Sequence, residues 1–259
     1  DTLAEADFPT MNDSATDGET QSHSTTNVQV PGVDEGDVIK TDGSRIYRIK
    51  YNELQVVDLL PDGQMEIILE GSMDTANDDT RYTYFTDLYL TDDELVVVGQ
   101  RYHYFILAMD GGVMESQDDA DIVGDWYWYG VPQTYLMIYD LETLSLKDEV
   151  EITGNLMTTR LIDDNLYVIS SHYVYMYEDD VDPRPFVRVG DEVMVPEYTD
   201  IKYIPDMMMN SFTMVTRVNL EGEIDVDFDI FLGDSGWGQI YVSTEAIYLA
   251  TTTYRWDDT

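Results

Sequence analysis

The chain has no cysteine, and its basic residues are scarce: 13 lysines and arginines in 259 residues, against 53 aspartates and glutamates. Without cysteine there is no disulfide framework, thiolate nucleophile, iron–sulfur cluster or zinc ribbon. Binding to phosphate needs a basic surface that displaces counterions, so a formal charge of −40 argues against DNA, RNA and anionic lipid as partners. The composition excludes a nucleic-acid-binding role and predicts partners that are cationic, neutral or bridged by a metal ion.

Long apolar runs are also missing. The best are short, such as Leu95–Val98, whereas a membrane helix needs about 18 or more apolar residues. We therefore expect no membrane span in this chain. The 43% of hydrophobic residues nevertheless suffices for a sizeable core. Mutual repulsion of the carboxylates is relieved by salt, so this halophilic-like composition predicts a protein from a salty medium or one whose surface binds divalent cations. The alternative is a merely acidic extracellular protein.

Helical periodicity is nearly absent from the sequence. Residues 1–26 are mostly Asp, Glu, Thr, Ser, Asn and Ala and predict a disordered acidic leader or linker. From Asn27 onwards, short runs of β-branched and aromatic residues are broken by Asp, Asn and Gly, which is typical of strands and turns. The sequence predicts one all-β domain over residues 27–259.

One unit recurs four times within this domain. An apolar strand, a tight polar turn and a second strand occur around Ile46–Tyr47, Leu95–Val96, Leu166–Tyr167 and Ile247–Tyr248. The first three copies continue with a third and a fourth strand. Repeated four-stranded antiparallel units are the blades of a β-propeller. We predict about three and a half blades. Because a ring normally takes about four to eight, we expect a partial or truncated ring, with either further chain past Thr259 or an open edge.

Two insertions interrupt the repeats, at about 104–134 and about 173–211, each between a second and a third strand. Both should lie on the same face of a propeller. The first contains carboxylates that suit calcium and then aromatic residues whose faces suit sugar rings or proline-rich peptides. The aromatic run is equally compatible with an extra strand that covers the blade below. The predicted metal ligands are Asp118, Asp119 and Asp121, and the predicted ligand-binding residues are Trp126, Tyr127, Trp128 and Tyr129.

Other acidic and apolar clusters have structural interpretations beside functional ones. Asp34, Glu35 and Asp37 could bind a cation or form a turn with Lys40 as counter-charge. Asp225, Asp227 and Asp229 alternate with apolar residues, so they share one face of a predicted outermost strand, where they either bind a cation or discourage sheet pairing.

The second insertion contains the acidic run 178–182 and the methionines 207–209, which could bind a partner or fill a gap beside the blade. The three histidines, His23, His103 and His172, are too scattered to predict a metal site. A hydrolytic triad cannot be argued from this sequence.

The stretch Thr26–Gly43, followed by Ile46–Tyr47, resembles the entry motif of a family of secreted prokaryotic proteins whose C-terminal β-propeller domain is distantly related to WD40 repeats. Pro183–Pro185 and the strand Met214–Leu220 are similar to later parts of that family's pattern. The resemblance implies a propeller in an extracellular or cell-envelope location. It brings no catalytic residues.

The sequence therefore favours a binding or scaffold module that presents an acidic, aromatic-rich face to an extracellular protein or glycan. One alternative is an enzyme acting on polysaccharide, with two carboxylates about 5 to 10 Å apart as acid and base. Another is a cell-wall component stabilised by calcium. Calcium is the only cofactor for which the sequence offers candidate ligands.

Overall fold

The computed structural model describes residues 30–73, 81–108, 113–114, 126–173, 183–203, 205, 210–233 and 239–250. These segments are built from strands and turns, and none of the described residues is helical. The predicted all-β class is thus confirmed for the described chain. In the same segments there is no helix that could cross a membrane. The predicted leader, residues 1–26, lies outside the described residues.

The first sheet contains four antiparallel strands in chain order. They are β1 (Ile39–Thr41), β2 (Arg45–Lys50), β3 (Glu53–Leu59) and β4 (Met65–Ser72). The turn between β2 and β3 places Tyr51 and Asn52 at positive φ, 53° and 61°, the geometry that matches the twist of a two-residue hairpin. The Asn52 amide then reaches the neighbouring sheet, where it donates to the Thr83 carbonyl at 2.6 Å and accepts from the Phe85 N–H at 3.2 Å.

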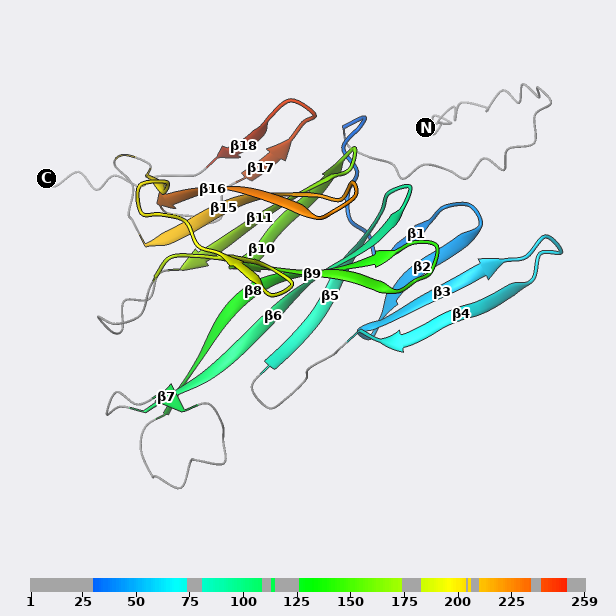
Figure 1. Ribbon diagram of the computed structural model, residues 1–259, viewed down its shortest axis with the longest axis horizontal. Coiled ribbons are helices and arrows are strands. Elements are labelled where there is room, and N and C mark those ends of the chain that lie inside the picture. The colour runs from blue at the N-terminus through cyan, green and yellow to red at the C-terminus, as the bar shows by residue number, and fades with distance from the viewer. Residues whose placement is uncertain are drawn as a thin grey trace, which may run out of the picture.

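The second sheet is the largest (Figure 1). Its strands are β5 (Arg81–Leu90), β6 (Glu94–Ala108), β8 (Trp126–Asp140) and β9 (Leu146–Thr153), with β7 (Val113–Met114) on β6, and β12 (Val187–Val189) and β13 (Glu192–Met194) beyond β9.

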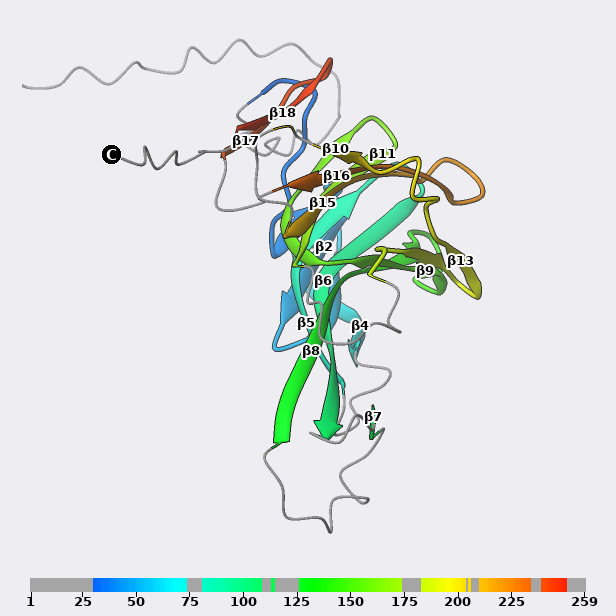
Figure 2. The same cartoon turned by 90° about the vertical axis from the view of Figure 1, so that its left-hand side faces the viewer.

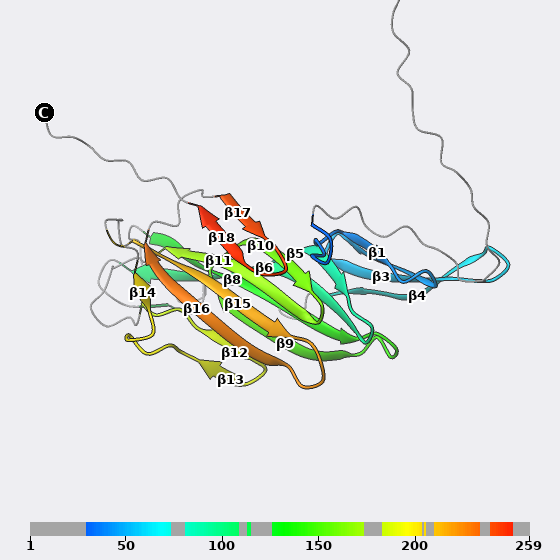
Figure 3. The ribbon, with the colours of Figure 1, turned by 90° about the horizontal axis from the view of Figure 1, so that it is seen from above.

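The third sheet follows the same plan, and a two-stranded fourth sheet comes after it. The third contains β10 (Asn155–Ile162), β11 (Asn165–Tyr173), β15 (Ser211–Asn219) and β16 (Asp225–Gly233), with β14 (Lys202–Tyr203) parallel to the end of β16. The fourth is the hairpin of β17 (Gln239–Val242) and β18 (Ile247–Ala250). Figure 1 shows the first, second and third sheets one after another, and Figures 2 and 3 show the same sheets from two other sides.

Two apolar clusters join the first three sheets, and the second sheet contributes one face to each. Because side chains alternate along a strand, Leu95 and Val97 enter the cluster with the first sheet, whereas Val96 and Val98 enter the cluster with the third. All four side chains are fully buried. Burial on both faces explains why this strand has a continuous apolar run rather than an alternating pattern.

An ionic network is buried beside the cluster that the first and second sheets share. Glu151 on β9 accepts from Arg101 on β6 at 2.7 Å and from Arg188 on β12 at 2.6 Å. The Arg101 guanidinium also lies 3.4 Å from the centre of the Tyr135 ring. Arg101 and Glu151 are each 7% exposed. Each charge is therefore stabilised by its partner rather than by water.

The strands of the repeated unit lie where the sequence predicts them, but the predicted second insertion behaves differently from a simple loop. Its β12–β13 hairpin crosses to the second sheet, where Val187 and Val189 pair with Ile152 and Val150. The second and third sheets thus contain, beside the four predicted strands of the unit, further short strands that come from the two insertions. Likewise β16 is not outermost along its whole length, since Lys202 of β14 pairs with Phe231.

Candidate functional site

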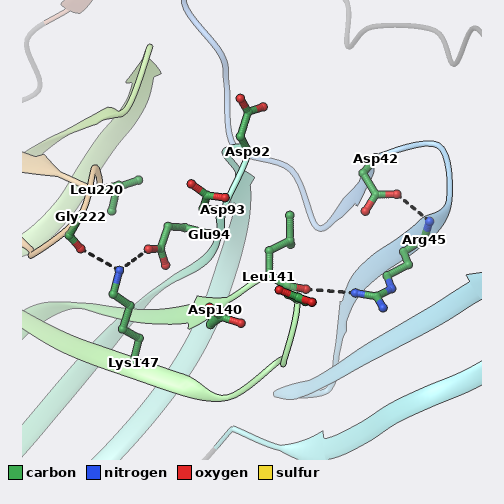
Figure 4. Close-up of a pocket in the computed structure, with 11 residues that line it drawn as sticks. Asp42, Arg45, Asp92, Asp93, Glu94, Asp140, Leu141, Lys147, Leu220 and Gly222 are labelled. Carbon is green, nitrogen blue, oxygen red and sulfur yellow. Dashed lines mark hydrogen bonds and ion pairs between the residues drawn. The ribbon is translucent and has the colours of Figure 1, made fainter.

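Four turns enclose a cavity of about 390 Å³ at one end of the sheets (Figure 4). They are the β1–β2, β5–β6, β8–β9 and β15–β16 turns, and we call the space between them the turn cavity. Its lining contains two basic residues, Arg45 and Lys147, and six acidic ones: Asp42, Asp92, Asp93, Glu94, Asp140 and Glu142. The acids occupy these positions because Asp, Asn and Gly favour the backbone angles of tight turns.

Both basic side chains of the turn cavity are already engaged. Arg45 donates to Asp58 at 2.9 Å and to the Leu141 carbonyl at 3.0 Å. Lys147 forms an ion pair with Glu94 and donates to the Gly222 carbonyl at 2.8 Å. Only Glu94 among the six lining carboxylates is neutralised directly by Lys147, so the cavity keeps a strongly negative lining.

Glu94 is the most deeply buried of the six carboxylates in this lining. The residue is 3% exposed, and its Oε1 atom pairs with Lys147. Its Oε2 atom is buried as well and has no hydrogen-bond partner among the described residues. A buried carboxylate oxygen left without a donor is costly. A cation or donor group that reached Oε2 would therefore stabilise this wall of the cavity.

Two further carboxylates of the cavity stay ionised because of their turns. For Asp42, burial opposes ionisation, but hydrogen bonds from the Tyr47 hydroxyl and from the Arg45 and Ser44 N–H groups outweigh it and lower the pKa. Hydrogen bonds from the side chain and N–H of Thr143 lower the pKa of Asp140. A general acid needs a raised pKa, so neither residue suits that role.

The carboxylates surround the cavity rather than converge on one point. No three His, Cys, Asp or Glu side chains in the described segments are grouped so that they could hold a metal ion. A compact divalent ion needs several oxygens at about 2.0 to 2.6 Å. The described geometry therefore suits an extended organic cation better than a metal ion.

The structure describes the predicted insertion site only in part. Trp126, Tyr127, Trp128 and Tyr129 form the start of β8, and their backbones pair with Ala108, Leu107, Ile106 and Phe105 of β6. The aromatic run therefore lengthens the predicted third strand of its unit rather than adding a separate strand, and its side chains lie outside the described part. Asp118, Asp119 and Asp121 also lie outside the described residues, and so do the acidic run 178–182 and the methionines 207–209.

The remaining acidic clusters have basic partners. Asp34 pairs with Lys40 at 2.8 Å, and Glu35 approaches Arg160 at 3.4 Å. The register places Asp225, Asp227 and Asp229 on one face of β16, as predicted. Of these, Asp225 pairs with Arg217 on the adjacent strand and Asp229 with Lys202. These contacts support the structural interpretation of both clusters.

The sequence patterns did not identify the turn cavity. Asp42 and the pair Asp92–Asp93 were interpreted as turn formers, and they are, whereas Asp140 was assigned to the end of a third strand and Glu142 was not singled out. The signal that could have revealed the site is their recurrence: acids lie at the first hairpin turn and at the turn before the fourth strand in successive units, and these turns share one end of a propeller.

His172 on β11 offers a pH-dependent measurement. Burial lowers the pKa of its imidazole, and Nδ1 has no partner among the described residues. The unfolded chain binds a proton near pH 6.5 and the folded chain only at lower pH. The stabilising effect of neutral His172 is therefore complete above pH 6.5 and is lost as the pH falls towards the folded pKa.

We expect the His172→Gln variant to lose unfolding free energy less steeply than wild type between pH 7 and pH 5. Urea titrations at several pH values would measure both slopes. Both proteins contain the same carboxylates, so the difference between the two slopes reports the titration of His172. Identical slopes would contradict the prediction.

A family model described as Beta propeller domain matches residues 23–259. A protein of Archaeoglobus fulgidus, described as an uncharacterized protein, is 25% identical over 245 residues. That alignment covers 90% of this chain but 33% of the relative, so the chain spans about a third of the length of the protein it matches. No solved structure matches the chain.

Proposed function

The chain belongs to the beta-propeller domain family, and on that premise we propose that it is a non-catalytic binding module that holds a cationic segment of a partner protein at the turn cavity. Its sheets are successive blades, and the turns that enclose the cavity belong to three of them. We place the protein outside the cell or in the cell envelope, as the resemblance of its entry motif to secreted proteins implies.

The observation that carries the proposal is the charge of the turn cavity. Its lining has six carboxylates, and its two basic groups are already held by Asp58, Glu94 and backbone carbonyls. A lysine or arginine side chain entering the cavity would meet negative potential from several sides, and the low-dielectric protein walls would strengthen it. Arginine also donates in a planar fork that matches a carboxylate.

The spread of the carboxylates favours such a ligand over the two alternatives. A wall component stabilised by calcium needs converging oxygens, which the described residues do not provide. An enzyme acting on polysaccharide needs one carboxylate with a raised pKa, whereas the pKa values of Asp42 and Asp140 are lowered. Glycan binding through Trp126–Tyr129 stays a prediction.

The test uses fluorescent octa-arginine and octa-lysine as probes at about 0.15 M salt, because lower salt exaggerates surface electrostatics. The variant Asp92→Asn, Asp93→Asn, Glu142→Gln removes three cavity charges, none of which accepts a hydrogen bond among those described. We expect the dissociation constants to rise about 10- to 100-fold, since rim and buried charge pairs contribute roughly 0.5 to 3 kcal/mol each. Fluorescence anisotropy would measure the change.

A matched control removes three charges outside the turn cavity: Glu66→Gln, Asp191→Asn and Glu192→Gln. We expect it to weaken binding less than about 3-fold, as for long-range screened charge. Equal weakening by the two variants would mean that only net charge attracts the probes. Unchanged binding by the cavity variant would place the site elsewhere, and selective binding of cellohexaose would favour the glycan alternative.

A further inference from the structure

The segment Val30–Lys40, which we call the N-terminal clasp, crosses the inner edges of the second and third sheets. Asp34 and Leu161 of β10 exchange two backbone hydrogen bonds, with N–O distances of 2.7 and 3.1 Å, and the Leu88 N–H of β5 donates to the Asp37 carbonyl at 2.8 Å. Both β5 and β10 are terminal strands of their sheets. The clasp thus satisfies backbone groups on edges that have no further strand beside them.

The start of the clasp contacts the β17–β18 hairpin. Val30, Val33 and Glu35 surround a space of about 30 Å³ together with Ile240, Tyr241 and Val242. Val33 is 2% exposed and Val242 5% exposed, and Arg160 of β10 lines the same space, so buried apolar side chains meet there beside the Glu35–Arg160 ion pair. Gly32 has a φ of +82°, and a Cβ atom there would lie 3.3 Å from Thr244 Cγ2, which shows how closely the clasp follows the hairpin.

The β17–β18 hairpin has little other support among the described strands. It forms a two-stranded sheet by itself, and the third sheet approaches it through Arg160 of β10, which lines the same small space. Isolated two-stranded hairpins are marginal in water. The contact with the clasp therefore contributes to the order of the hairpin.

Lys40 holds the clasp in this path. Its Nζ atom donates to both carboxylate oxygens of Asp34, at 2.8 and 2.9 Å, and to the Glu35 carbonyl at 2.7 Å. The residue is 7% exposed, and Nζ lies 5.6 Å from the centre of the Tyr89 ring. These bonds fix the chain reversal at Asp34–Glu35, which sets the position of everything before it.

From these contacts we infer that the N-terminal clasp is one conformational unit held in place by Lys40. Loss of the Lys40 bonds would free the clasp and disorder the β17–β18 hairpin. A residue of the first strand thereby controls the order of a hairpin some 200 positions later in the chain. The clasp and the turn cavity share no lining residue, so this coupling is independent of the proposed binding function.

Hydrogen exchange of the full chain tests the coupling, because the Leu88 and Leu161 amides donate to the clasp itself. In Lys40→Met we expect these two amides and those of β17 and β18 to exchange about 10- to 100-fold faster, as for loss of a hydrogen bond to a charged group. Amides in the β6–β8 ladder should keep their protection. Lys50→Met, which changes an exposed lysine of β2, is the matched control and should leave both sets unchanged.

A second variant tests the contact between Val33 and the β17–β18 hairpin separately from the Lys40 hydrogen bonds. Val33→Ala keeps Lys40 and its bonds, so it should speed exchange in β17 and β18 and leave the Leu161 amide protected. Uniform loss of protection across all sheets in Lys40→Met would overturn the inference. So would unchanged exchange of β17 and β18 in both variants.

Discussion

Replacing Glu151 with alanine is expected to lower the free energy of unfolding by about 3 to 5 kcal/mol. The substitution leaves the Arg101 guanidinium buried without its anion, since Arg101 is 7% exposed and its remaining polar partner is the Thr83 hydroxyl. It also frees Arg188, which ties the β12–β13 hairpin to β9. Equilibrium unfolding in urea would measure the loss.

The matched control for Glu151 is Asp225→Ala, which breaks the exposed pair with Arg217. Surface pairs contribute about 0 to 1 kcal/mol, so the control should change stability little. The double variant Arg101→Met, Glu151→Met should be more stable than Glu151→Ala, because apolar replacement of both partners removes the uncompensated charge. Equal losses for Glu151→Ala and Asp225→Ala would show that the network is solvated.

Raising KCl from 0.05 to 2 M should raise the thermal midpoint by on the order of 10 °C. With 53 acidic and 13 basic residues, at least 40 carboxylates have no lysine or arginine of their own, and their repulsion opposes the compact state. Relief of several kcal/mol corresponds to this shift in a domain of this size, at roughly 2 to 4 °C per kcal/mol. Differential scanning calorimetry would measure the midpoints.

The shape of the salt series identifies its cause. The screening length falls from about 10 Å at 0.1 M to about 3 Å at 1 M, so most of the rise should occur below about 0.5 M. A rise that continues evenly to 2 M would instead reflect general strengthening of apolar burial by salt. A flat series would remove repulsion as a determinant of stability.

The local elements of this fold were predictable because neighbouring residues determine them. The run Leu95–Val98 and the polar turn before it predicted a hairpin, and the same pattern located its counterparts at Ile46, Leu166 and Ile247. The pairing of Val187 and Val189 with β9 was not predictable. Nothing in a three-residue strand specifies a partner in another unit, since that choice depends on which sheet edge the fold leaves open.

The candidate site illustrates the same limit. Asp92 and Asp93 were interpreted correctly as turn residues and Asp140 as the end of a strand, but the cavity exists only because turns from three sheets meet. Their meeting depends on how the sheets fan out, which is set by the apolar clusters between them. The sequence pattern of one unit carries no information on the angle between neighbouring sheets.

The β12–β13 hairpin also bears on how such a chain can change during evolution. The hairpin is encoded between two strands of the third sheet but extends the second. Deleting, duplicating or exchanging one unit would therefore strip its predecessor of two strands and of the Arg188 partner of Glu151. The second and third units should be inherited as a pair, and recombination boundaries that keep the protein stable should fall outside them.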